Sequence, residues 1–261
     1  MAFTGLIGLA FILVFFGLIL FFTAIRREDA ETHLRPIPAF EKLSRAIGLA
    51  VEAGSRLHIS LGRGKLSGTE SAAAFVGLSV LENIIRSASS GDNPPIATSG
   101  DATLAILSRD TLSATYREIG ISDQYHPTSG ELAGMTPFSY AVGALSTVED
   151  NKTSTHILLG HFGNEVALIG DAAERNNDLT LAGTDNLPAQ AILFATAQEP
   201  LIGEELYASG AYTQAGRMHI ASLRAQDVMR WLLVAVIVGG VILNFAGLDE
   251  LVGELLGGIT P

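Results

Sequence analysis

The stretch THILLGHFGNEVALIGDAAER (residues 155–175) decides the fold of this chain. Its first six residues form a short apolar run, which predicts a buried strand over 155–160. His161 and Phe162 follow as a turn, and a helix is predicted from Gly163 to about residue 175. The next stretch repeats this order, with a strand over 178–183, a turn at Thr184 and Asp185, and a helix from about 186 to 196. Strands that alternate with helices of this length predict right-handed crossovers and a parallel sheet.

The same pattern recurs three times upstream. The predicted units are a strand over 57–61 with a helix over 69–89, a strand over 95–99 with a helix to about 119, and a strand over 131–135 with a helix to about 150. Further helices are predicted over 39–53 and 201–212. The predicted fold class is therefore α/β: a Rossmann-like or flavodoxin-like parallel sheet of about five βα units, flanked by two transmembrane helices.

Two of the strands share a phrase, since residues 58–62 read HISLG and residues 156–160 read HILLG. An old duplication of half the domain is one explanation. The other is that two unrelated strand-to-helix turns reuse the same residue types, which is common because such turns share their capping chemistry. We favour the second explanation.

The two ends of the chain are strongly apolar. Residues 3–25 contain no charge over 23 positions, and residues 231–248 form a second apolar run interrupted by Asn244. About 20 apolar residues are enough to cross the hydrocarbon core of a bilayer. We therefore predict a transmembrane helix at each end. A cleaved signal peptide is not expected at the first, because the run is too long and its arginines follow it.

The orientation is predicted from the basic residues beside the spans. Those that flank the central segment are Arg26, Arg27, Arg35, Arg217, Arg224 and Arg230. The tail after residue 248 contains no Lys or Arg. Because basic residues accumulate on the cytoplasmic side, we expect a plasma-membrane protein with both termini outside. The expected layout is a juxtamembrane linker over 26–38, a cytoplasmic α/β domain over 39–226 and a short acidic tail over 249–261.

Composition narrows the function classes. The chain contains no cysteine, which excludes disulfides, thiolate nucleophiles and cysteine metal sites. Its formal net charge of −11 argues against nucleic acid as a partner, since such binding depends on cationic surface. The expected partner is the lipid bilayer, and a homo-oligomer and a small anionic ligand stay open.

The loop after the first strand is the strongest candidate for ligand binding. In open parallel sheets, ligands bind beyond the carboxyl ends of the strands. The candidate residues in this loop are Gly62, Arg63, Gly64, Lys65, Gly68 and Thr69. Glycine backbone next to a helix N-terminus suits an anion, but the spacing matches neither a Walker A motif nor a dinucleotide fingerprint. A solvated surface loop is the alternative.

Four more candidates follow the other strands. Asp101 and Asp185 each precede a predicted helix, so capping is their default role and contact with a ligand is the alternative. His161 and Gly163 follow the strand over 155–160. His58 and His156 lie early in their strands, so we expect them to be buried and hydrogen-bonded. Glu165 faces the same choice as Asp101 and Asp185, and the helix dipole favours a glutamate there without any function. No catalytic residue, cofactor or metal site is assigned.

Three phrases carry a resemblance to a known family. They are HFGNEVALIGDAAER (161–175), LAGTDNLPAQAILFATA (181–197) and PLIGEELYASGAY (200–212). They resemble an uncharacterised family of bacterial membrane proteins, a domain of unknown function with one span near each end. The resemblance implies the two-span layout and no activity, substrate or catalytic residue.

Three functions stay open at this point. The first is a non-catalytic module that binds a small anionic ligand or assembles into oligomers, which we prefer because no catalytic motif is present. The second is an enzyme acting on a nucleotide or phosphorylated molecule through Asp101, Asp185 and His161. The third is a structural scaffold.

Overall fold

The computed structural model describes residues 2–25, 34–214, 216–245 and 247. These residues form two compact units: His33–Gly216, and Met1–Thr32 with Arg217–Pro261. The predicted tail over 249–261 and most of the predicted linker over 26–38 lie outside the described residues.

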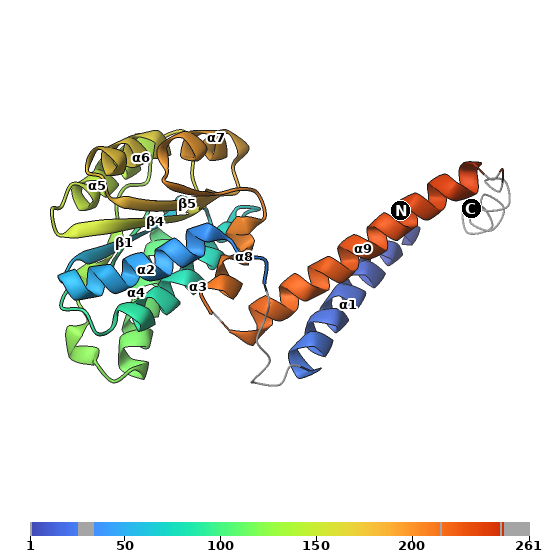
Figure 1. Ribbon diagram of the computed structural model, residues 1–261, viewed down its shortest axis with the longest axis horizontal. Coiled ribbons are helices and arrows are strands. Elements are labelled where there is room, and N and C mark those ends of the chain that lie inside the picture. The colour runs from blue at the N-terminus through green and yellow to red at the C-terminus, as the bar shows by residue number, and fades with distance from the viewer. Residues whose placement is uncertain (1, 26–33, 215, 246, 248–261) are drawn as a thin grey trace. The chain divides into compact units, whose positions relative to one another are not determined.

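The central unit is built on one parallel sheet (Figure 1). Its strands are β1 (Arg56–Gly62), β2 (Ile96–Ser99), β3 (Gly130–Leu132), β4 (Thr153–His161), β5 (Leu179–Thr184) and β6 (Glu199–Leu201). They lie in the order β3-β2-β1-β4-β5-β6, which is the Rossmann order. The predicted fold class is confirmed. The sixth strand is an addition: it has three residues, includes Pro200 and lies at the edge of the sheet, where proline is tolerated.

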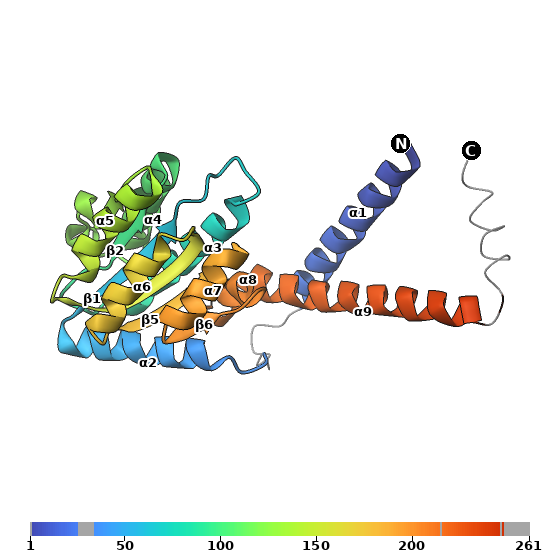
Figure 2. The same ribbon diagram turned by 90° about the horizontal axis from the view of Figure 1, so that it is seen from above.

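Helices cover both faces of the sheet (Figures 1 and 2). The helices α2 (Pro38–Ala53), α3 (Ser71–Ala88), α4 (Ala102–Glu118) and α8 (Glu205–Tyr212) pack on one face. The helices α5 (Pro137–Val148), α6 (Val166–Arg175) and α7 (Leu187–Thr196) pack on the other. Two short 3₁₀ turns, η1 (Ser122–Gln124) and η2 (Pro127–Ser129), precede β3.

The two faces of the sheet differ in polarity because successive side chains alternate across a strand. The face under α2, α3 and α4 is apolar and includes Ile59, Ile157 and Leu181. The opposite face carries His58 and His156, directly paired across β1 and β4 and both fully buried. The two similar phrases of the sequence are thus neighbours in register.

The terminal helices form the second unit. They are α1 (Ala2–Ile25) and α9 (Arg217–Phe245), and they contact each other. At about 1.5 Å per residue, both exceed the roughly 30 Å thickness of a hydrocarbon core. Their most apolar windows have mean hydropathies of 2.8 and 2.1, so both are long and apolar enough to cross a membrane. The helix α9 begins well before the apolar run at Trp231, and Ala221, Ala225 and Met229 form a buried stripe at a spacing of four on this earlier part.

Candidate functional site

The strand order reverses between β1 and β4, so the crevice at their carboxyl ends is the expected ligand site. Gly62, the last residue of β1, pairs with His161, the last residue of β4. All ten residues predicted from the sequence lie at this carboxyl edge, at strand ends or in the loops that follow. The structure therefore brings the loop over 62–69 beside His161, and sets Asp101 and Asp185 on opposite sides of the crevice.

Arg63 does not present a free cation to this crevice. Its backbone N–H donates to the carbonyl of His161 at 2.8 Å, and its Nη1 pairs with Glu165 Oε1 at 3.1 Å. The same carboxylate oxygen accepts the backbone N–H of Gly163 at 3.0 Å. The pair ties the loop after β1 to the loop after β4. Arg63 thus acts as a structural cross-link, and its contact with an anion stays a prediction.

Glu165 forms a buried ion pair that the sequence did not indicate. It is only 6% exposed although it is acidic. Burial opposes its ionisation, but hydrogen bonds from the backbone N–H groups of Gly163 and Glu165 itself and the contact with Arg63 lower its pKa below the ordinary value. A glutamate in a first helical turn has a sufficient explanation in the helix dipole, so the sequence contained no signal for this pairing.

His161 lies between two carboxylates. Its Nδ1 is 2.7 Å from Asp185 Oδ1, and its Nε2 is 3.6 Å from Glu70 Oε1. Asn186, and not Asp185, occupies the N-cap position of α7, so capping is the wrong role for Asp185. The backbone N–H of Lys65 donates to the other oxygen of Glu70 at 3.4 Å. Asp185 orients the imidazole and leaves Nε2 facing the loop.

Asp101 does take its default role. Its Oδ1 accepts the backbone N–H groups of Thr103 and Leu104 at 2.9 and 3.0 Å, so it caps α4. Beside this cap lies a hollow of about 300 Å³, lined by Lys65, Leu66, Ser67, Asp101 and Thr103. Its residues come from the loops after β1 and β2 and from the first turn of α4. Two of the predicted residues, Lys65 and Asp101, therefore share one concave surface.

The remaining loop residues have smaller roles. Gly64 lies so close to β4 that an added Cβ would meet the Cβ of His161 at 3.1 Å. Gly68 donates to the carbonyl of Lys65 at 3.4 Å and closes a turn, and Thr69 is exposed. Within the described part of the chain, Lys65 forms no salt bridge. It is therefore the cation that the loop keeps available.

A buried polar chain runs across the strands, further from their carboxyl ends. The Nδ1 atoms of His58 and His156 are 3.2 Å apart, and their Nε2 atoms bind Thr98 Oγ1 at 2.8 Å and Asp178 Oδ2 at 3.2 Å. The expectation that both histidines are buried and hydrogen-bonded is confirmed. Near the carboxyl ends, Ser60 hydrogen-bonds the fully buried Tyr140, and burial raises the pKa of Tyr140 to about 12.

His58 makes folding depend on pH. Burial first, and the charge of His156 second, lower the pKa of His58 well below its ordinary value. As the pH falls through about 6.5, the unfolded chain therefore binds a proton at His58, whereas the folded chain does not. Stability is fully present above that pH and is lost as the pH falls, by at most about 1.4 kcal/mol per pH unit for one proton.

We expect His58→Gln to flatten this dependence. Chemical denaturation of the full chain in a mild detergent at pH 7, 6 and 5 measures the slope for both proteins. The slope matters rather than the stability itself, because the substitution disturbs the core in addition. Parallel slopes for wild type and variant would show that His58 does not contribute.

No three His, Asp or Glu side chains are placed to hold a metal ion in residues 2–25, 34–214, 216–245 and 247.

Comparison with known proteins identifies the family of the chain. A family model described as a domain of unknown function (DUF6754) matches residues 3–253. No curated protein and no solved structure matches the chain.

Proposed function

We propose a function for this chain, which belongs to the family of the domain of unknown function DUF6754. It is a membrane-anchored module that binds a small phosphorylated molecule. The observation that carries this proposal is the hollow at the carboxyl edge of the sheet, formed by residues that follow β1 and β2. It combines the available cation of Lys65, the hydroxyl groups of Ser67 and Thr103, and the carboxylate of Asp101. A ligand with a phosphate for Lys65 and hydroxyl groups for Asp101 matches this set.

The other contacts at the carboxyl edge of the sheet support ligand binding more directly than catalysis. Arg63 and Glu165 neutralise each other, and the backbone N–H groups of Arg63, Lys65 and Gly68 are bound within the protein. The loop is thus held in one conformation before a ligand arrives, which reduces the entropy lost on binding. Because Lys65 supplies the remaining positive charge, we expect moderate affinity and a preference for a single phosphate group.

The two apolar helices support a double anchor in the membrane. Arg217, Arg224 and Arg230 precede the apolar part of α9, which favours a cytoplasmic domain. Because the chain has no cysteine, a single cysteine at exposed Ser146 reports the side of the domain. An impermeant maleimide should label it only after the cells are opened, and labelling of intact cells would refute a cytoplasmic domain.

Replacing Lys65 by Gln should weaken binding about tenfold or more, since a charge-assisted hydrogen bond contributes about 1.5–3 kcal/mol. The measurement is thermal unfolding of the full chain in detergent with nucleoside monophosphates and sugar phosphates. A ligand at 100 times its Kd should stabilise the folded state by about 2.7 kcal/mol. The dephosphorylated compounds should give no shift.

Lys152→Gln is the matched control for this test. It removes the same charge from an exposed lysine directly before β4, at the opposite edge of the sheet, and should leave binding unchanged. Asp101→Asn keeps the cap, because Asn and Asp cap helices equally well, so any change in affinity reports contact with the ligand. Equal losses in Lys65→Gln and Lys152→Gln would refute the site.

A second candidate function is acid–base catalysis on the same ligand. It is favoured by the 2.7 Å contact of Asp185 with His161, which resembles the orientation of a catalytic imidazole by a carboxylate. This candidate requires turnover of a bound compound that His161→Gln abolishes while binding persists. Binding without turnover would leave the non-catalytic module as the function.

A further inference from the structure

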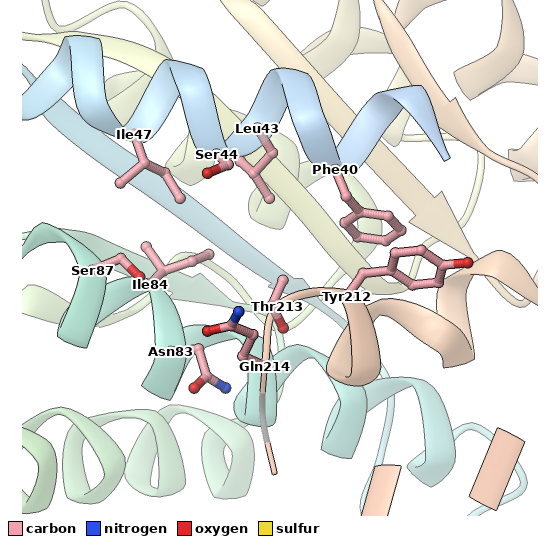
Figure 3. A pocket seen from close by; sticks show the side chains of 10 residues that line it. All are labelled: Phe40, Leu43, Ser44, Ile47, Asn83, Ile84, Ser87, Tyr212, Thr213 and Gln214. Atoms are coloured by element: carbon pink, nitrogen blue, oxygen red, sulfur yellow. The ribbon is translucent and has the colours of Figure 1, made fainter. Parts of the chain in front are cut away.

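A second pocket lies on the sheet face opposite α5, α6 and α7, between α2, α3 and the end of α8 (Figure 3). Its volume is about 190 Å³. Its floor includes the buried apolar side chains of Phe40, Leu43 and Ile84. The ring of Tyr212 stacks on Phe40 with centroids 4.8 Å apart. An engineered cavity of about 150 Å³ holds benzene, so this pocket has room for one ring.

The rim of the pocket is polar but uncharged. It consists of Ser44, Asn83, Ser87, Thr213 and Gln214. The surrounding helix surfaces carry Glu41, Lys42, Arg45, Glu82 and Arg86, yet none of these is among the residues found to line the pocket. A charged ligand would lose its hydration here without gaining an ionic partner. The rim therefore favours a neutral ligand.

Gln214 is held in a backbone conformation that glutamine rarely adopts. Its φ is 62°, and within the described residues Asn177 is the other non-glycine residue with positive φ. Asn tolerates this region through its short side chain, and glycine is the usual residue just after a helix. Figure 3 shows the Gln214 side chain reaching from the end of α8 toward α3, on the side of Asn83. The unfavourable backbone conformation of Gln214 thus places its side-chain amide at the pocket.

Asn83 adds a second amide on the same side. Its Nδ2 donates to the carbonyl of Ser79 at 2.8 Å, which leaves Oδ1 as an acceptor. The two amides and the stacked rings offer complementary surfaces to one kind of molecule. We propose that this pocket binds a small uncharged ring of nucleobase size that carries amide or hydroxyl groups. The ring packs against Phe40, Ile84 and Tyr212, and the amides of Asn83 and Gln214 bond its polar edge.

A ligand in this pocket affects the junction at which the chain enters and leaves the domain. The hydroxyl of Tyr212 donates to the carbonyl of Arg35 at 2.5 Å, and Arg35 Nη2 pairs with Glu205 at 2.9 Å. Tyr212 therefore joins the segment that enters the domain to the segment that leaves it, and α9 begins soon afterwards at Arg217. A ligand held by Tyr212 and Gln214 stabilises this junction and couples the pocket to the segment that precedes α9.

The test uses the full chain in detergent with uracil and benzamide as probes, and binding is followed by saturation-transfer NMR. In Gln214→Gly, both probes should bind about fivefold more weakly, which corresponds to one hydrogen bond. The Tm of this variant should not fall, because glycine suits the left-handed backbone. Asn177→Gly is the matched control, since it relieves the same conformation away from the pocket and should leave binding unchanged.

A plugged pocket separates specific binding from partition into the detergent. Ser44 is exposed on α2, so Ser44→Trp should fold and should abolish the signal of both probes. Three outcomes would overturn the proposal: neither probe binds the wild type, the signal survives in Ser44→Trp, or Gln214→Gly binds as tightly as the wild type.

Discussion

Replacing Arg63 by Met should lower the free energy of unfolding by about 3–5 kcal/mol, the range found when one partner of a buried ion pair is removed. The remaining Glu165 is 6% exposed, so its carboxylate would stay away from water without a cationic partner. Methionine keeps much of the length of the side chain, so lost packing contributes less than the orphaned charge. Chemical denaturation of the full chain in a mild detergent at pH 7 measures the effect.

The pH dependence of this variant gives an internal check. In the wild type, the pKa of Glu165 is lowered, so its contribution is present above the ordinary carboxyl pKa and lost as the pH falls. Without Arg63, burial should raise that pKa, so the folded variant gains a proton before the unfolded chain does. The difference in stability between wild type and variant should therefore shrink from pH 7 to pH 4.

A double variant completes the cycle. Arg63→Met with Glu165→Gln removes both charges, and should recover part of the loss because no unpaired carboxylate remains. If the double variant is as unstable as the sum of the two single variants, the pair is not coupled. The cross-link between the loops after β1 and β4 would then have to come from the backbone contact of Arg63 with His161 alone.

The second large effect is expected at Gly62. Its φ is +72°, and an added Cβ would lie 2.9 Å from the backbone nitrogen and carbonyl carbon of His161, and closer still to its oxygen. Both the backbone conformation and the collision disfavour any side chain, and the neighbour is main chain that cannot rotate away. We expect Gly62→Ala to destabilise the protein by about 2–5 kcal/mol.

Gly203→Ala separates the two causes. Gly203 has a similar φ of +60°, but an added Cβ would meet nothing within 4 Å. This variant should therefore show the conformational effect alone, about 1 kcal/mol. The difference between the two variants, read from denaturation curves under the same conditions, measures how closely β1 and β4 approach at the crevice. Equal effects would show that the loop relaxes and that the approach is not rigid.

The local elements of this protein follow from its sequence because their signals are local. The apolar runs at 57–61, 155–160 and 178–183, each followed by a turn and a helix, contain the period and the length of buried strands and crossover helices. The same holds for the two terminal apolar runs, whose length alone identifies helices able to cross a bilayer. The edge strand β6 was not predicted, because three residues that include a proline show no hydrophobic period.

Which loops meet was decided only by the tertiary structure. A strand predicted from its own residues does not specify its neighbour, so the reversal between β1 and β4 could not be read from the sequence. That reversal brings Arg63 to Glu165 across 102 positions of the chain, and the pairing of β4 with β5 brings His161 to Asp185 across 24. The second pocket likewise needs α2, α3 and α8 together.

The sequence by itself therefore determined the elements other than β6, the α/β class, the two apolar helices and the edge of the sheet where ligands bind in such folds. The structure decided the roles of individual side chains at that edge: Arg63 as a cross-link, Asp101 as a cap, Asp185 as the partner of His161, and Lys65 beside a hollow. The physical reason is that periodicity and capping act within a few residues, whereas charge pairing and burial depend on segments that only the packed sheet brings together.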